Sequence, residues 1–226
     1  RAKEILGAAD SAGLTEAVRA EWAKANSETK AYLAQVIAAI GLRDLAPEVR
    51  DLVRQKDEKL RAGAAAALAG LADDSTRDVL RGLLSDASAL VQTAAYRSLH
   101  RTLGERIDPG RLASYPPELR LLALGDLGRE KVGKDEEFAP LSKLLADEDW
   151  RVACAVAVTL GKLFQERAIP ALEAPAKSSD WRHRGAAAVA LTRILRKESV
   201  PPLLDLLQDK HAVVQGAALK GLQHLT

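Results

Sequence analysis

The sequence is short of the residues on which many kinds of functional site depend. It holds one cysteine, Cys154, and no methionine, and aromatic residues make up only 4% of its 226 residues. A single cysteine excludes an internal disulfide framework and a metal site built from several thiolates. No apolar run approaches the length of a membrane span, and no signal-like segment opens the chain. Because the chain begins at Arg1 and lacks methionine, we expect residues to have been removed upstream.

Strong charge of one sign is also missing. The 33 basic and 31 acidic residues are interspersed and give a formal net charge of +2. This balance predicts no strong field for binding a polyanion. Alanine, leucine and arginine are abundant instead, and alanine and leucine lose little conformational freedom in a helix. The composition therefore favours helices, with a core assembled from many small contacts.

A repeat with a period of 31 residues runs along the chain. One series of apolar residues recurs at steps of 31, with a single step of 61: Leu6, Ile37, Leu68, Leu99, Leu160, Leu191 and Leu222. A second series has the same period and the same slip: Val18, Val49, Leu80, Leu141, Leu172 and Leu203. Two series in one register predict a repeated structural unit.

Each repeat is predicted to contain two helices, which we call A and B. Helix A has a short apolar stripe, as in residues 201–209, with proline in its first turn. Helix B carries apolar residues at helical spacing, as at Val152, Val156, Leu160 and Leu163. We expect aspartates to cap helix B, at Asp57, Asp86, Asp149 and Asp180. No repeat can bury its stripe alone, so the repeats must stack into a solenoid.

The expected fold is an all-α solenoid, or superhelix, of about seven stacked two-helix repeats. The fourth repeat, at about residues 104–136, is irregular: a helix B is expected at residues 118–127, but Asp108-Pro109-Gly110 and Pro116-Pro117 interrupt the segment before it. We expect residues 1–226 to form one continuous solenoid, with two domains divided near Gly133 as the alternative. Leu6-Gly7 lies where a helix B should end, without a helix A before it. We therefore expect a fragment of a longer array, or terminal faces that meet a partner.

The pattern within each repeat resembles the HEAT-like repeats first described in phycobilisome lyases. The matching residues of the last repeat are Pro201, Leu203, Leu206, Leu207, Asp209, Val214, Ala217, Ala218 and Leu222. The resemblance covers essentially the whole chain and is specific for the fold, in which B helices line the concave surface. It implies no single function, because such repeats serve as protein-interaction scaffolds, chromophore lyases, hydroxylases and DNA glycosylases.

One position departs from the family pattern. The arginine that usually follows the valine of helix B is present as Arg61 and Arg184. Gln92, Ala153 and Gln215 occupy this position in other repeats. We therefore expect any ladder of stacked arginines between repeats to be incomplete.

Two Asp-Trp-Arg tripeptides, at residues 149–151 and 180–182, indicate a binding surface. On each helix B the tryptophan and arginine fall on the side opposite the core, next to small residues, and neighbouring helices lie about 10 Å apart. Tryptophan and arginine dominate interface hot spots. We predict a partner-binding groove formed by Trp150, Arg151, Val158, Trp181, Arg182, Val189, Lys220, Arg97 and Tyr32. The alternative is that each tryptophan packs against the adjacent loop and each arginine caps carbonyls.

The groove is expected to be polar at one end and aromatic and basic at the other. Its polar wall comes from the earlier repeats: Glu28, Tyr32, Gln35, Glu58, Lys59 and Arg97. Tyr115, in the irregular repeat, extends the wall if its side chain points inward.

No catalytic constellation is evident. His100, His183, His211 and His224 form no close-spaced pair with a carboxylate or with one another, and no His-Glu dipeptide occurs, which argues against the iron-binding hydroxylases. We expect His183 to be partly buried and hydrogen-bonded, and Cys154 to be inert. Asp149 and Asp180 are explained as helix caps. We therefore expect no enzymatic activity, no cofactor and no metal.

The function expected is that of a non-enzymatic scaffold that binds a protein or peptide in the groove. Two alternatives stay open. In the first, a glycosylase-like HEAT protein binds nucleic acid, with Arg151 and Arg182 on phosphates and the tryptophans stacked on bases, although the near-neutral charge argues against it. The second, a bilin lyase or chromophore chaperone, is favoured only by the family resemblance.

Overall fold

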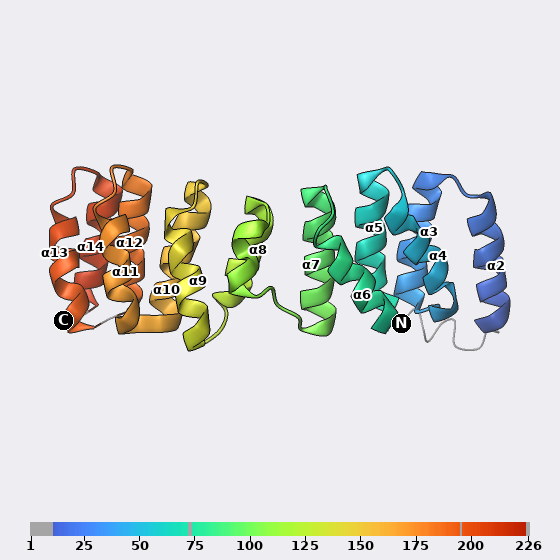
Figure 1. The fold of residues 1–226 in the computed structure, drawn as a ribbon, viewed down its shortest axis with the longest axis horizontal. Coiled ribbons are helices and arrows are strands. Elements are labelled where there is room, and N and C mark those ends of the chain that lie inside the picture. Colours follow the sequence, from blue (N-terminus) through green and yellow to red (C-terminus); the bar gives the residue numbers. More distant parts are fainter. Residues whose placement is uncertain (1–10, 72–73, 195, 225–226) are drawn as a thin grey trace. The chain divides into compact units, whose positions relative to one another are not determined.

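The computed structural model describes residues 11–71, 74–194 and 196–224. Within these ranges every regular element is an α-helix or a short 3-10 helix, which confirms the predicted all-α fold of stacked two-helix repeats (Figure 1). None of the described helices combines the length and the apolar character that a membrane crossing requires. Leu6 and Gly7, where the sequence predicts the end of a helix B, lie outside the described residues.

The chain divides into two compact units, Arg1–Arg106 and Ile107–Thr226. The division falls at the start of the irregular repeat and not near Gly133. One continuous solenoid over residues 1–226 stays a prediction, and each unit is described by itself below.

The first unit contains three A–B pairs. They are α2 (Ser11–Lys24) with α3 (Ser27–Ile40), α4 (Ala46–Asp51) with α5 (Glu58–Leu68), and α6 (Asp74–Leu83) with α7 (Ala89–Leu103). The B helices α3, α5 and α7 pack side by side in chain order. Both periodic series supply the core, because Ile37, Leu68 and Leu99 of the B helices and Val49 and Leu80 of the A helices are buried.

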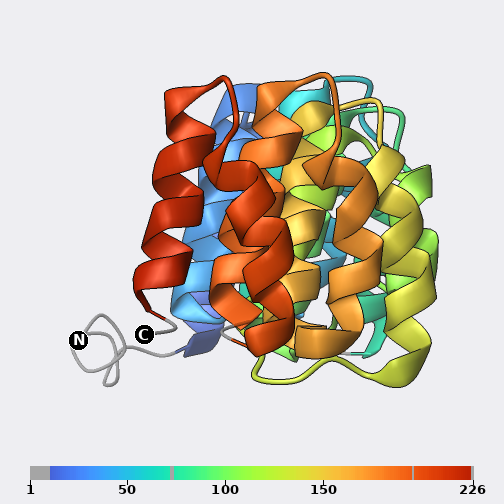
Figure 2. The same cartoon turned by 90° about the vertical axis from the view of Figure 1, so that its left-hand side faces the viewer.

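The second unit begins with the irregular repeat. A 3-10 helix, Pro109–Ser114, stands where helix A would be, and α8 (Pro117–Leu127) is its helix B. Three regular pairs follow: α9 (Asp135–Lys143) with α10 (Trp150–Phe164), α11 (Ile169–Ala176) with α12 (Trp181–Ile194), and α13 (Val200–Leu207) with α14 (Ala212–Gln223). Figure 2 shows the last pair, in red, as an antiparallel hairpin. The B helices α8, α10, α12 and α14 again pack in chain order.

Three of the four predicted caps are confirmed. The carboxylates of Asp57, Asp149 and Asp180 each accept the backbone N–H two residues later, at 2.8–2.9 Å. The prediction for Asp86 is wrong, because α7 begins at Ala89 and Ser88 is its N-cap residue. The Asp86 carboxylate binds the Arg61 guanidinium and the Ser88 N–H instead, so it holds the loop before the helix.

Arginine–aspartate pairs with little exposed side-chain surface join successive repeats. The Arg61 guanidinium binds Asp86 at 2.9 Å, and the Arg184 guanidinium binds Asp209. Each arginine also donates to two carbonyl oxygens of the loop before its own helix. Arg120 of α8 makes the equivalent pair with Asp147, which the sequence analysis missed because that repeat is irregular.

Where glutamine replaces the arginine, its side chain binds the loop before its own helix. The side-chain amides of Gln92 and Gln215 donate to the carbonyl oxygens of Asp86 and Asp209, both at 2.6 Å. Each glutamine therefore holds the loop of its own repeat, without the bridge to the next.

Close packing of neighbouring B helices depends on a glycine at two places, one in each unit. A Cβ on Gly161 of α10 would lie 2.8 Å from the carbonyl oxygen of Ala190 on α12. A Cβ on Gly70, in the 3-10 helix Ala69–Leu71 that follows α5, would lie 2.8 Å from the carbonyl oxygen of Ala38 on α3. Only a residue without a side chain permits this backbone approach.

Candidate functional site

Each Asp-Trp-Arg tripeptide forms a compact structure at the start of a helix B. The Asp149 carboxylate caps α10 through the Arg151 N–H and also binds the Arg151 guanidinium. Asp180 and Arg182 repeat this arrangement at the start of α12. The hydrogen bond from the arginine side chain, with the backbone bond, lowers the pKa of Asp149 and that of Asp180 to about 2. Both carboxylates are therefore ionised at neutral pH and offset the charges of their arginines.

The tryptophan of each tripeptide has a partly exposed side chain. Trp150 is 41% exposed and Trp181 is 40% exposed. A residue of the following repeat covers each ring: the Arg182 guanidinium carbon lies 4.4 Å from the Trp150 ring centroid, and the His211 ring stacks on Trp181 at 4.1 Å and an angle of 3°. These contacts fix the orientation of the indoles while leaving area available to a ligand.

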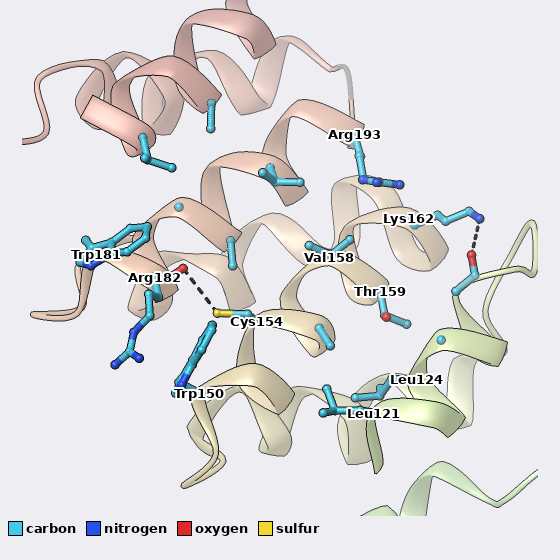
Figure 3. Close-up of a pocket in the computed structure, with 18 residues that line it drawn as sticks. Leu121, Leu124, Trp150, Cys154, Val158, Thr159, Lys162, Trp181, Arg182 and Arg193 are labelled. Atoms are coloured by element: carbon cyan, nitrogen blue, oxygen red, sulfur yellow. Dashed lines mark hydrogen bonds between the residues drawn. The ribbon is translucent and has the colours of Figure 1, made fainter. Parts of the chain in front are cut away.

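Both indoles line a groove on the B helices of the second unit. The groove has a volume of about 890 Å³ and takes its walls from α8, α10, α12 and α14. Figure 3 shows Trp150, Trp181 and Arg182 together at one end. Small or apolar residues line the middle: Cys154, Ala155, Val158, Gly185, Ala186 and Val189. These small side chains account for the space between the helices.

The other end of the groove is basic. Lys162 of α10 and Arg193 of α12 line it, and Figure 3 places both away from the indoles. The Lys162 ammonium donates to the carbonyl oxygen of Gly128 at the end of α8. The sequence analysis missed both residues, because basic residues in a last helical turn are ordinary partners of the helix dipole.

Five of the nine predicted binding residues line the groove: Trp150, Val158, Trp181, Arg182 and Val189. Arg151 faces a separate, smaller hollow beside Arg120, and Lys220 is exposed on α14 without lining the groove. Tyr32, 63% exposed on α3, and Arg97, exposed on α7, belong to the first unit.

Tyr115, whose orientation the sequence left open, does not line the groove. Its side chain is only 6% exposed and packs into the second unit, directly before the proline that caps α8. Tyr115 directly follows the 3-10 helix Pro109–Ser114, and the Arg111 guanidinium carbon lies 5.9 Å from the ring centroid.

The thiol of Cys154, in the middle of the groove, is not activated as a nucleophile. Burial raises the pKa of the Cys154 thiol, which donates a hydrogen bond to the Arg182 carbonyl oxygen at 3.4 Å. His183 is partly buried and lies 3.4 Å from the Ser178 hydroxyl. Among the described residues, no group of three His, Cys, Asp or Glu side chains is placed to hold a metal ion.

A family model for HEAT repeats matches residues 12–100, 110–179 and 174–226. The chain therefore belongs to the HEAT repeat family. A search of curated proteins finds no match.

Several solved structures resemble the chain in fold. Human deoxyhypusine hydroxylase in complex with glycerol is 22% identical, with 88% of this chain and 80% of that chain covered and a TM-score of 0.47. An engineered protein is 23% identical, with coverage of 98% and 66% and a TM-score of 0.49. A designed armadillo repeat protein in complex with the peptide (KR)4 is 19% identical, with coverage of 98% and 96% and a TM-score of 0.39. Each likeness concerns the fold alone.

Proposed function

We propose that this HEAT repeat protein is a non-enzymatic scaffold that binds a segment of a protein partner in the groove of its second unit. The observation that carries the proposal is the pair of indoles, Trp150 and Trp181, each about two-fifths exposed at one end of an apolar groove of about 890 Å³. Tryptophan is the side chain most enriched at interface hot spots.

The site is organised before a ligand arrives. Arg182 and His211 hold the two indoles in place, and the helices that carry them are joined by buried contacts. A rigid site loses little conformational entropy on binding, so more of the contact energy remains as affinity. The small side chains of Ala155, Gly185 and Ala186 leave room for larger apolar side chains of a partner.

The charges beside the indoles favour a protein segment over a nucleic acid. Asp149 and Asp180 offset the charges of Arg151 and Arg182, the two arginines that would contact phosphates. A phosphate would therefore compete with a carboxylate already in place. The chromophore lyase alternative stays an untested prediction.

Selection from a library of random peptides, displayed on phage, tests the proposal. The selected peptides are expected to bind the Trp150→Ala/Trp181→Ala variant at least about thirtyfold more weakly than the native chain, because hot-spot side chains contribute about 2 kcal/mol or more. Isothermal calorimetry measures the affinity, and circular dichroism confirms that the variant is folded.

The matched control is Leu204→Ala, which removes an apolar side chain that is 50% exposed on the A helix α13, outside the groove. It should leave peptide affinity unchanged. Equal binding to the native chain and the double tryptophan variant, or a selection without specific binders, contradicts the proposal.

A further inference from the structure

We infer that the segment bound in this groove is apolar along its length and carries carboxylates at one end, which lies against the C-terminal ends of α10 and α12. This inference rests on the proposed function and adds the chemistry and the direction of the occupant.

The direction follows from a register that two neighbouring helices share. Trp150 is the first residue of α10 and Lys162 follows it by twelve positions; Trp181 is the first residue of α12 and Arg193 follows it by twelve. At about 1.5 Å per residue, each cation lies about 18 Å along the helix from its tryptophan. Because α10 and α12 lie side by side, the groove has an aromatic end and a basic end (Figure 3).

The charges at the two ends differ. At the aromatic end, the Arg182 guanidinium is bound to the Asp180 carboxylate at 2.9–3.0 Å and offers little net charge. At the basic end, neither Lys162 nor Arg193 forms an ion pair with a carboxylate in the described part of the chain. No aspartate or glutamate is among the described residues that line the groove. The positive charge of the groove is therefore concentrated at one end, without internal compensation.

Lys162 and Arg193 differ in their burial and in the contacts that they make within the protein. Lys162 is half-buried and donates to the Gly128 carbonyl oxygen, which stabilises the end of α8. Arg193 is exposed at the edge of the groove. Its planar guanidinium is suited to a carboxylate, which it can bind through two parallel hydrogen bonds. Arg193 is therefore the principal anchor, and Lys162 adds to the local positive potential.

The length of the groove limits the occupant. A span of about 18 Å accommodates about twelve residues of an α-helix or five to six residues of an extended strand. One end of such a segment places apolar side chains against Trp150 and Trp181, and the other places aspartate or glutamate at Arg193. The small residues between the ends accept the apolar side chains in the middle.

The test repeats the random-peptide selection on the native chain and on the charge-reversed variant Lys162→Glu/Arg193→Glu. Lys143→Glu/Lys177→Glu, with the same change in net charge on exposed lysines near the ends of the A helices α9 and α11, is the control. Peptides selected on the native chain should be enriched in aspartate and glutamate at one end. Replacing those residues by glutamine, or reversing the two cations, should each weaken binding about tenfold, and the control should not.

Each outcome separates the inference from the proposed function. Peptides that depend on Trp150 and Trp181 but show no acidic end, and bind the charge-reversed variant equally well, overturn the inference and leave the function standing. A selection without tryptophan-dependent peptides overturns both. Tryptophan-dependent binding of a dansyl-labelled fatty acid in the absence of any selected peptide identifies an anionic lipid as the occupant, and also overturns both.

Discussion

At the scale of the residue, the ion pair of Arg184 and Asp209 joins two successive repeats in an enclosed position. Their side chains are only 9% and 7% exposed, and the guanidinium also donates to the carbonyl oxygens of Ser178 and Ser179. The Arg184 side chain, with a smaller contribution from the His211 N–H, lowers the pKa of Asp209 to about 2. A pair so deeply enclosed stabilises the fold only while both partners are charged.

The Asp209→Asn variant should therefore lose about 3 kcal/mol of unfolding free energy at neutral pH, because it leaves the Arg184 charge buried without a counter-charge. Urea denaturation followed by circular dichroism measures the loss. The control Asp205→Asn, at an exposed position of α13, should change stability by less than about 0.5 kcal/mol.

The same pair predicts a pH dependence. The folded pKa of Asp209 is about 2 and its ordinary value is 3.8, so the stabilisation is fully present above about pH 4 and is lost as the pH falls through 2. The difference in stability between the native chain and Asp209→Asn should therefore shrink over this range. A difference that stays constant down to pH 2 would show that the ion pair is not its source.

At the scale of the element, the spacing of neighbouring B helices depends on Gly161. A methyl group there would meet the backbone of Ala190, whose carbonyl oxygen cannot move without displacing α12. Since α10 and α12 form two walls of the groove, a shift between them also changes the distance between Trp150 and Trp181.

Gly161→Ala is expected to destabilise the protein by about 1–3 kcal/mol, the usual effect of overpacking, despite the better helix propensity of alanine. Gly216→Ala is the matched control, because a Cβ at that position of α14 meets no atom within 4 Å. The control should stabilise the protein slightly, by up to about 1 kcal/mol. Thermal unfolding of the two variants distinguishes the effects, and equal melting temperatures would refute the close-approach argument.

At the scale of the whole molecule, the described chain consists of two compact units, each with its own buried series of leucines. In repeat proteins, stability is the sum of the repeats and of the interfaces between nearest neighbours. A destabilising substitution in one unit is therefore expected to weaken the helices of that unit most.

Leu160→Ala, at a fully buried position of α10, should cost about 2–5 kcal/mol. Amide hydrogen exchange is expected to accelerate in α10 and α12 and to change little in α3 and α5. The reciprocal variant Leu68→Ala should produce the opposite pattern. Uniform acceleration over both units would instead show one cooperative solenoid.

Repetition explains how much of this fold was predictable. Positions such as Ile37, Leu68 and Leu99 recur at one interval, so each supports the others, and all are buried. Non-repeating segments lack this redundancy. Tyr115 follows a 3-10 helix of irregular sequence, and its burial depends on tertiary packing that no local pattern records.

The candidate site was predictable only in part. Trp150 and Trp181 stand out in the sequence because large aromatic side chains are unusual on the face of a helix opposite its buried apolar residues. Both line the groove. Arg151 resembles Arg182 in sequence but faces another hollow, since only Arg182 has a tryptophan of the preceding repeat beside it. Lys162 and Arg193 were missed because a helix end accounts for a cation there without any ligand.

The Asp-Trp-Arg tripeptide combines the start of a helix and the display of an indole in three consecutive residues, with the aspartate and arginine binding each other. The cap and the aspartate–arginine pair lie within three consecutive residues, and a side chain of the next repeat, Arg182 or His211, then covers the indole. Duplication of a 31-residue repeat would copy one part of the proposed binding surface together with the helices that support it. Lengthening such an array and enlarging its recognition site would then be a single genetic event.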